Sequence, residues 1–279
     1  MIRIVADTTS TISPKEALRL GIYYLPQIII FGDQAYRDDN ELTSVEFLAK
    51  LRASTVLPKT AAPPPILYHP IYEELSNRGD TIIVICPSHK VSGTYRSAAD
   101  AALEFPQADI RIVDTQTLGP ALGTIVLKAL EWADQGMNAD LIVKNIEEMG
   151  KRARIYFYVD TLEYLYKGGR IGTASALVGS LLQVKPILIF KDGQVNPFDK
   201  QRTKKKALAR IVELIKEECP PKEESYLCIL EADAMEDALA LKKEFQDMLK
   251  INSIQIANLP PAIIVHVGPG VVAASFFTD

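Results

Sequence analysis

The sequence predicts an α/β protein of two domains: an N-terminal, doubly wound and mainly parallel α/β domain, and a C-terminal α+β domain with a mixed sheet. Short apolar strand patterns alternate with helical patterns up to about residue 153. Beyond it, a hairpin turn at Asp192-Gly193 interrupts this alternation. A length of 279 residues also suits two domains. We expect them to span residues 1–153 and 154–279.

In the first domain, residues 2–6 form an apolar run that predicts a buried strand followed by a polar turn. Ser13 as cap and Pro14 at the first helical position predict a helix that ends at Gly21. The remaining elements expected here are strands at 23–31 (broken at Pro26), 81–86 and 110–113, and helices at 44–53, 66–77, 93–104, 121–134 and 139–150.

The strand expected at 81–86 and the helix expected at 44–53 can be described more closely. The continuous apolar run 81–86 is typical of a strand at the centre of a parallel sheet. The helix expected at 44–53 has Ser44 as its candidate cap, and its apolar residues at helical spacing are Val45, Leu48 and Leu51.

The second domain mixes a hairpin with crossovers. The return strand of the hairpin begins at Gln194-Val195. The last expected strand runs from Ala262 to Val267 and ends at Gly268-Pro269-Gly270. The other expected elements are strands at 155–159, 185–190 and 225–231, and helices at 203–217 and 234–250.

Composition excludes several classes of function. The net charge of −4 argues against a chain-wide grip on nucleic acid. The three cysteines form no CxxC pair, so we expect neither a disulfide framework nor a zinc site, and we predict a reducing, cytoplasmic setting. His69 and His89 have no third ligand at metal spacing, so no metal site is expected. No apolar run reaches ~18 residues, so no integral membrane segment is expected.

The most informative segment is Ser92-Gly93-Thr94, which follows the central strand and opens a helix. Free backbone N–H groups and the positive end of the helix dipole make such a place an anion site. Ligands of open α/β sheets bind outside the carboxyl ends of the strands. The alternative is that Ser92 is simply an N-cap.

The segment Ser92 to Ala98, SGTYRSA, resembles the SGTYxSA segment of the DegV family of bacterial fatty-acid-binding proteins. The resemblance spans residues 2–270, and further matching motifs lie in the right order. They are Asp7-Thr8, Lys59-Thr60, Asp114-Thr115, LEYLYKGGRIG at 162–172, LLQVKPIL at 181–188, RTKKKAL at 202–208, and His266 with Gly268-Pro269-Gly270.

This resemblance implies a non-catalytic protein that binds one long-chain, palmitate-like fatty acid and needs no cofactor. The acyl chain would lie in a tunnel, with the carboxylate in the cleft between the domains. The implied carboxylate ligands are Thr60 and Ser92, with Gly93 and His266 close by. The resemblance also implies presentation of the fatty acid to a separate ATP-dependent fatty acid kinase. The acyl phosphate product would enter phospholipid synthesis.

The sequence departs from the family pattern near the implied head group. The usual Thr-Ser-Gln-Pro-Ser is Thr60-Ala61-Ala62-Pro63-Pro64 here, which removes two polar side chains. The segment that begins at Asp7 lacks the second acid of the usual Asp-Ser-x-x-Asp turn.

Two other classes of function stay open as alternatives. The first is an acyl hydrolase or transferase with Ser92 as nucleophile and His266 as base, although no GxSxG elbow surrounds Ser92. The second is a nucleic-acid regulator, against which the net charge and the lack of a recognition-helix motif both count.

Several motifs carry both a structural and a functional interpretation. Lys167 to Arg170 is either a structural turn or a docking surface for the kinase. The basic run Lys200 to Lys206 is either a solvated helix start or a surface for an acidic partner. In the family interpretation, Arg170 and Arg202 lie at the edge of that partner-facing surface. Asp7 and Asp114 end predicted strands, where they either cap neighbouring helices or tune the site.

Overall fold

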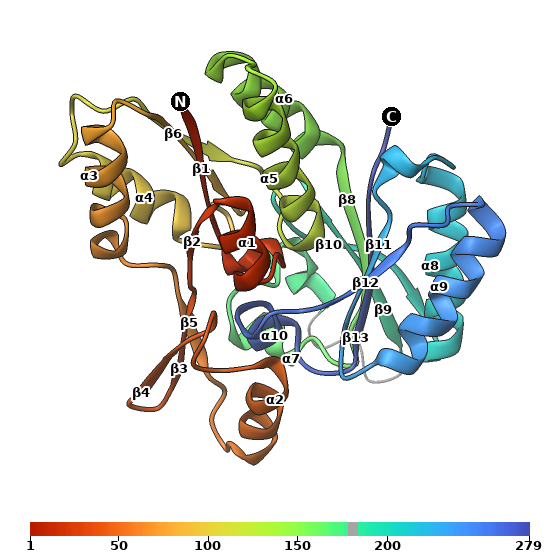
Figure 1. The fold of residues 1–279 in the computed structure, drawn as a ribbon. Coiled ribbons are helices and arrows are strands. Elements are labelled where there is room, and N and C mark those ends of the chain that lie inside the picture. The colour runs from red at the N-terminus through yellow and green to blue at the C-terminus, as the bar shows by residue number, and fades with distance from the viewer. Residues whose placement is uncertain (178–183) are drawn as a thin grey trace. The chain divides into compact units, whose positions relative to one another are not determined.

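The computed structural model describes residues 1–177 and 184–279, which form two compact units (Figure 1). Unit 1 comprises Met1–Thr43 and Pro58–Lys151, and unit 2 comprises Ser44–Leu57 and Arg152–Asp279. The predicted domains, 1–153 and 154–279, stay a prediction, and the units differ from them chiefly by placing residues 44–57 in unit 2. The first three residues of the LLQVKPIL motif, 181–183, lie outside the described residues.

Unit 1 is built on a four-stranded parallel sheet with the order β2-β1-β6-β7. The strand predicted at 81–86 is confirmed as β6, and it lies between β1 and β7. Its residues from Ile82 to Cys86 are all buried, as a continuous apolar run in a parallel sheet requires. The strands are β1 (Ile2–Asp7), β2 (Tyr23–Leu25), β6 (Thr81–Cys86) and β7 (Ile110–Asp114).

Helices cover both faces of this sheet, which confirms the predicted α/β architecture. Figure 1 shows α3 and α4 on one side and α5 and α6 on the other. Tyr72 and Ala98 pack with Val84 and Cys86 in one buried cluster between α3, α4 and the sheet. The helices are α1 (Pro14–Leu20), α3 (His69–Asn77), α4 (Thr94–Ala102), α5 (Gly119–Asp134) and α6 (Ala139–Arg152).

The signals that predicted α1 act as expected. The Ser13 hydroxyl accepts the Glu16 N–H at 3.1 Å, and Pro14 is the first helical residue. Gly21 ends the helix at φ +70°, a backbone conformation that glycine adopts without strain.

A three-stranded antiparallel sheet, with the order β4-β3-β5, also belongs to unit 1. Its strands are β3 (Ile28–Phe31), β4 (Gln34–Arg37) and β5 (Lys59–Ala61). The sequence predicted β3 but neither β4 nor β5, because those two are short and largely polar. Thr60 pairs with Ile29 across β5 and β3, which fixes its place in the sheet.

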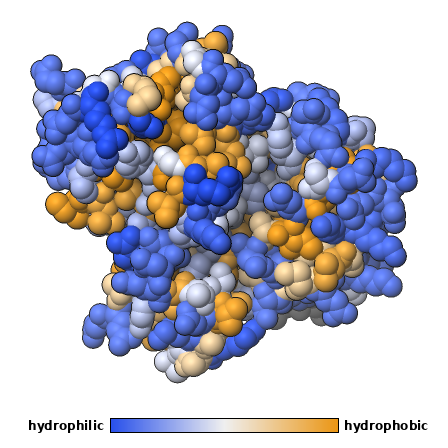
Figure 2. All heavy atoms as spheres, in the orientation of Figure 1, coloured by the Kyte–Doolittle hydropathy of each residue, from blue (hydrophilic) through white to orange (hydrophobic). Residues whose placement is uncertain are grey.

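Unit 2 is built on a six-stranded mixed sheet with the order β10-β9-β8-β13-β11-β12. Helices α8 and α9 bury Ile211 and Phe245 against Tyr156, Ile189 and Phe276 of the sheet. Figure 2 shows mainly hydrophilic residues on the outer side of these helices. The elements are β8 (Ala153–Tyr158), β9 (Lys185–Lys191), β10 (Gln194–Gln201), β11 (Cys228–Ala232), β12 (Gln255–Asn258), β13 (Val271–Phe277), α8 (Lys204–Glu218) and α9 (Met235–Leu249).

The strand predicted at Ala262–Val267 is wrong. That segment is helix α10 (Pro261–Val267), and the C-terminal strand is β13, which follows Gly270. Apart from His266 this segment is apolar, and a short apolar run does not distinguish a buried helix from a buried strand. Pro261 at the first helical position was the overlooked signal, since proline suits that position and interrupts a central strand.

Two details predicted for the helix at 44–53, the Ser44 cap and the place of Val45 on its apolar face, are wrong, although α2 (Ser44–Ala53) itself is confirmed. Ser44 is the first helical residue, and its hydroxyl donates to the Leu259 carbonyl at 3.1 Å instead of capping the helix. Val45 is 78% exposed, whereas Phe47 and Leu51 are buried. These two residues are four apart, so they lie on one face of the helix and that face is the buried one.

Candidate functional site

The loop after β6 positions the predicted anion site at its carboxyl end. The Ser88 N–H donates to the Thr117 carbonyl at 2.9 Å, and the Ser92 N–H donates to the Ser88 carbonyl at 3.0 Å. Helix α4 begins at Thr94, so Gly93 and not Ser92 occupies the N-cap position. Ser92 therefore does not occupy the N-cap position, although its hydroxyl accepts the Thr94 N–H at 3.3 Å. Its side chain is half-buried, and its Oγ lies 2.9 Å from Oγ1 of Thr94.

The segment that follows Thr60 reaches the same loop. A Cβ on Gly93 would lie 3.5 Å from the Ala62 Cβ, and the Ser97 hydroxyl of α4 donates to the Pro63 carbonyl. The structure thus brings the segment with Thr60 close to Ser92 and Gly93. Ala62 is thus a neighbour of Gly93.

A buried carboxyl group lies behind this loop. Asp7, at the end of β1, is 1% exposed. Its Oδ1 accepts the Thr9 N–H at 2.8 Å and the Thr9 hydroxyl, and its Oδ2 accepts Gln27 Nε2 at 2.8 Å and Thr94 Oγ1 at 3.0 Å. Burial raises the pKa of Asp7, and these hydrogen bonds oppose that effect.

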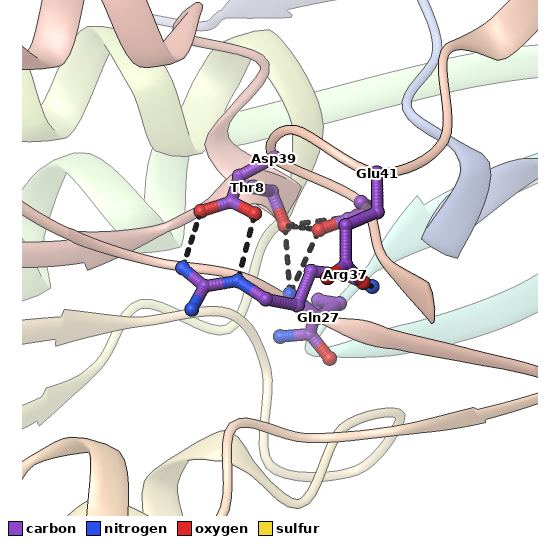
Figure 3. A network of polar contacts seen from close by, with 6 residues as sticks. Thr8, Gln27, Arg37, Asp39 and Glu41 are labelled. Carbon is purple, nitrogen blue, oxygen red and sulfur yellow. Dashed lines mark hydrogen bonds and ion pairs between the residues drawn. The ribbon is translucent and has the colours of Figure 1, made fainter. Parts of the chain in front are cut away.

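Gln27 connects Asp7 to a second carboxyl group, that of Asp38. The Gln27 backbone N–H donates to Asp38 Oδ1 at 2.8 Å, and the Thr8 hydroxyl donates to the same atom at 2.7 Å. Burial raises the pKa of Asp38 to about 7. Figure 3 shows Thr8 beside Gln27 in this network.

The adjoining turn after β4 is fixed by its own charges. The Arg37 guanidinium faces the Asp39 carboxylate, with Nη2 to Oδ2 at 2.7 Å (Figure 3). The Arg37 N–H donates to the Glu41 carboxylate at 2.7 Å. These contacts fix the conformation of the turn, and Asp38 in this turn accepts the Gln27 N–H.

Asp7 caps a helix, whereas Asp114 does not. Asp7 caps the short 3-10 helix Thr8–Ser10, which confirms the capping interpretation for that residue. Asp114 instead accepts the backbone N–H groups of His89 and Gln116 and pairs with the His89 ring. It therefore orders two loops and does not cap α5, whose N-cap position is Leu118.

Within 1–177 and 184–279, no group of three or more histidine, cysteine or acidic side chains could hold a metal ion.

The other predicted site residues lie in unit 2. His266 is in the last turn of α10, and Arg170 follows α7 (Glu163–Lys167). Burial, and to a smaller extent the charge of Arg170, lowers the pKa of His266 to about 4. The structure thus brings these two residues near one another, and the imidazole is neutral at pH 7.

The glycines of the KGGR segment form a structural turn. The Gly169 N–H donates to the Tyr166 carbonyl at 3.0 Å, and the Arg170 N–H donates to the Leu165 carbonyl at 2.9 Å. This pattern, with Gly169 at φ +69°, ends α7 in a Schellman motif. The structural-turn interpretation is confirmed, and a docking role stays a proposal.

Arg202 belongs to unit 2 and precedes α8. It is exposed immediately before Thr203, whose hydroxyl caps α8 by accepting the Lys206 N–H at 3.3 Å. Lys200, Lys205 and Lys206 are exposed, as a solvated helix start predicts. A role for this basic run toward an acidic partner stays a prediction.

Three residues of unit 1 were missed from the sequence: Gln27, Asp38 and Thr94. Thr94 lies inside the quoted SGTY motif, so it was visible there but was given no role. The signal at Gln27 was a single polar residue within an apolar run. Asp38 offered no local signal, because its hydrogen bonds come from Thr8 and Gln27, which are distant in sequence.

Comparison with known proteins identifies the family. A family model described as "Uncharacterised protein, DegV family" matches residues 1–279. The chain belongs to the DegV family. The resemblance predicted from the SGTY and LEYLYKGGRIG motifs is thereby confirmed. A DegV domain-containing protein of Halalkalibacterium halodurans is 33% identical over 279 residues, which cover 100% of this chain and 99% of that relative.

Solved structures of DegV family members share the fold. A fatty-acid-binding DegV family protein from Thermus thermophilus matches with a TM-score of 0.90 at 30% identity, covering 100% of this chain and 99% of that chain. DegV of Bacillus subtilis, also described as a fatty-acid-binding protein, matches with a TM-score of 0.86 at 33% identity and the same coverage. No helix in the described parts of the chain has both the length and the apolar character needed to cross a bilayer.

Proposed function

We propose that this chain binds one long-chain, palmitate-like fatty acid, with the carboxylate held at Thr60, Ser92 and Gly93 and with His266 close to it. The observation that supports this most strongly is that DegV proteins at 33% and 30% identity, matched over the whole chain, are fatty-acid-binding proteins. The residue types agree, since a carboxylate is bound by hydroxyl and N–H donors. Glycine at position 93 leaves room for a head group to come close.

The acyl chain supplies most of the binding free energy in this proposal. Each buried CH₂ group contributes ~0.8 kcal/mol, so a chain of about sixteen carbons binds without a cation beside its carboxylate. Neutral donors such as Ser92 and Thr60 then serve to fix the position of the head group. The site would therefore select ligands by the carboxyl group at one end and by the length of the acyl chain at the other.

A carrier fits the surroundings of Ser92 better than a hydrolase does. The Ser92 hydroxyl bonds to Thr94, and the group beyond Thr94 is the Asp7 carboxyl. A serine nucleophile instead needs a general base within hydrogen-bond reach. A serine that faces a carboxylate also has no ester to attack. We therefore propose a non-catalytic role for this chain.

We further propose that the bound acid is presented in the cytoplasm to an ATP-dependent fatty acid kinase. Arg202 is exposed at the start of α8, among the exposed Lys200, Lys205 and Lys206. Such a surface suits a partner that carries carboxylates or phosphates, because guanidinium groups bind both with two parallel hydrogen bonds. Arg170 is assigned to the same face by the family resemblance.

A displacement titration tests fatty-acid binding. Delipidated protein is loaded with a fluorescent polyene fatty acid, which is then displaced by palmitate or by methyl palmitate as the matched control. We expect displacement by palmitate and at least tenfold weaker displacement by the ester, which lacks the carboxylate. Equal displacement by both would contradict a carboxylate site. Release of palmitate from the ester would favour the hydrolase instead.

A further inference from the structure

A chain of three side chains connects the interior of unit 1 to the candidate head-group site. Asp7 Oδ2 lies 3.0 Å from Thr94 Oγ1, which lies 2.9 Å from Ser92 Oγ. Asp7 and Thr94 are 1% and 2% exposed, whereas Ser92 is half-buried. Only the Ser92 end of this chain is therefore accessible to a ligand.

The direction of these hydrogen bonds depends on one proton. An ionised Asp7 only accepts hydrogen bonds, so Thr94 must donate its single hydroxyl proton to it. Thr94 Oγ1 also accepts Gln27 Nε2–H at 3.0 Å, and its 2.9 Å contact with Ser92 Oγ is then a hydrogen bond in which Ser92 donates, since the proton of Thr94 is already used. In this state the Ser92 oxygen faces a ligand as an acceptor and has no proton to donate to a carboxylate.

Protonation of Asp7 reverses the direction. The Asp7 hydroxyl donates to Thr94, Thr94 donates to Ser92, and the Ser92 proton becomes available for a ligand carboxylate. Alternatively, with Asp7 ionised, a protonated ligand donates to the Ser92 oxygen. In either state, every hydrogen bond from Asp7 to the ligand has one donor and one acceptor, and one proton is shared between the Asp7 carboxyl and the ligand carboxyl.

We propose that Asp7 is a positioning residue that shares one proton with the ligand carboxyl group through Thr94 and Ser92, so that binding of a carboxylate is coupled to the uptake of one proton from solvent. This rests on the proposed function, because it requires Ser92 to face the head group. The proton goes to the Asp7 carboxylate or to the ligand carboxylate, and no covalent bond to carbon changes.

The surroundings of Asp7 support both of its states. The donors on Thr9 and Gln27 favour the ionised form of Asp7. Burial raises the pKa of Asp7, which favours protonation when a second negative charge arrives. The titratable groups that influence Asp7 or are influenced by it are Asp38, Tyr24, Tyr68 and Cys86. Among these none carries a positive charge, and burial raises the pKa of both phenols and of the thiol, so they stay neutral at pH 8.

Isothermal titration calorimetry counts the protons directly. Palmitate is titrated into delipidated protein at pH 8 in phosphate and in Tris, buffers whose enthalpies of ionisation differ. The difference in observed heat gives the number of protons taken up. We expect about one for the wild type, and affinity that falls about tenfold per pH unit above pH 8.

Two variants interrupt the series of hydrogen bonds from Asp7 through Thr94 to Ser92 at different points. Asp7→Asn removes the titrating group, and Thr94→Val keeps Asp7 and Ser92 but removes the hydroxyl between them. We expect proton uptake near zero in both. Asp38→Asn is the matched control, since it removes a half-buried carboxyl of the same network that bonds to Thr8 and Gln27. It should retain an uptake of about one proton.

The outcomes separate this proposal from the proposed function. No binding of palmitate by the wild type overturns the proposed function and with it the proton coupling. Binding without proton uptake by the wild type overturns the coupling alone. Uptake that persists in Thr94→Val also overturns it. A merely structural role of Asp7 or Thr94 would lower affinity without changing the number of protons.

Discussion

Gly168 lies directly against His266 in unit 2: a Cβ on Gly168 would stand 2.5 Å from the His266 Nδ1 and 2.8 Å from the Tyr164 carbonyl oxygen. Gly168 itself has φ −76°, which any residue can adopt. The glycine is therefore required by the close approach of α7 to α10 and not by its backbone conformation.

Gly168→Ala should disturb this approach. The added methyl group must displace the imidazole or the end of α7, because real Cβ contacts are longer. We expect the free energy of unfolding to fall by about 1–3 kcal/mol, the usual cost of overpacking. Urea unfolding measures this loss, and the NMR signals of the His266 ring should shift.

The neighbouring glycine provides the control. Gly169 has φ +69° and open space around its Cβ position, so Gly169→Ala introduces backbone strain of about 1–2 kcal/mol without touching His266. Its His266 ring signals should stay near those of the wild type. Unchanged ring signals in Gly168→Ala would contradict the packing described for α7 and α10.

The titration of His266 should differ from that of an exposed histidine. Burial, and then the charge of Arg170, lowers the pKa of His266 to about 4 from 6.5. An NMR titration should therefore find this imidazole neutral down to about pH 5. Arg170→Gln should raise the pKa but leave it below 6.5, because burial is the larger cause. A wild-type value near 6.5 would show that the ring is solvated.

The same shift predicts how stability depends on pH. Between pH 6.5 and 4 the unfolded chain binds a proton at His266 and the folded chain does not. The free energy of unfolding should therefore decrease as the pH falls from 6.5 to 4. His266→Gln should show a smaller decrease over that interval in urea unfolding. An identical slope in both proteins would contradict the assignment.

Ser92→Ala should weaken fatty-acid binding by roughly tenfold or more. A carboxylate that loses one donor retains an uncompensated desolvation cost of about 1–3 kcal/mol, and 1.4 kcal/mol corresponds to a factor of ten. The displacement titration with palmitate measures the change. Ser54→Ala, at an exposed serine of unit 2, is the matched control and should bind like the wild type. Equal affinity in a folded Ser92→Ala protein would remove Ser92 from the site.

Arg202→Ala should separate ligand binding from presentation. Arg202 is exposed, and an apolar tunnel has no need of its charge, so the variant should fold and retain its lipid. With a cognate kinase, acyl phosphate formation should slow on the order of 10²-fold, the effect of losing one electrostatic donor. Arg170→Ala should show a smaller effect. A wild-type rate for Arg202→Ala would place the partner surface elsewhere, and a lipid-free variant would place Arg202 in the binding site.

Local signals predicted most elements of the fold. The apolar run of β6, the Ser13-Pro14 cap of α1 and the Asp192-Gly193 turn between β9 and β10 each depend on residues close in sequence. Helix α10 was predicted as a strand and β13 was not predicted, because both are short and mostly apolar segments.

The candidate site was predictable in its motifs and not in its contacts. Ser92 and Gly93 stand out from the sequence because a helix start after a central strand binds anions. The link from Thr94 to Asp7 joins residues 87 positions apart, and that from Gln27 to Asp7 joins residues 20 apart. No local pattern encodes such pairs, so the buried carboxyl behind Ser92 became visible only in the folded chain.

The most direct test of fatty-acid binding is mass spectrometry of the purified protein. Under native conditions the chain should carry an adduct of one C14–C18 fatty acid, which denaturation releases and which is recovered by lipid extraction at about one molecule per chain. Ser92→Ala and Thr60→Val should carry less under the same purification. Purified wild-type protein that carries no fatty acid, and that gains no such adduct on incubation with palmitate, would contradict the account.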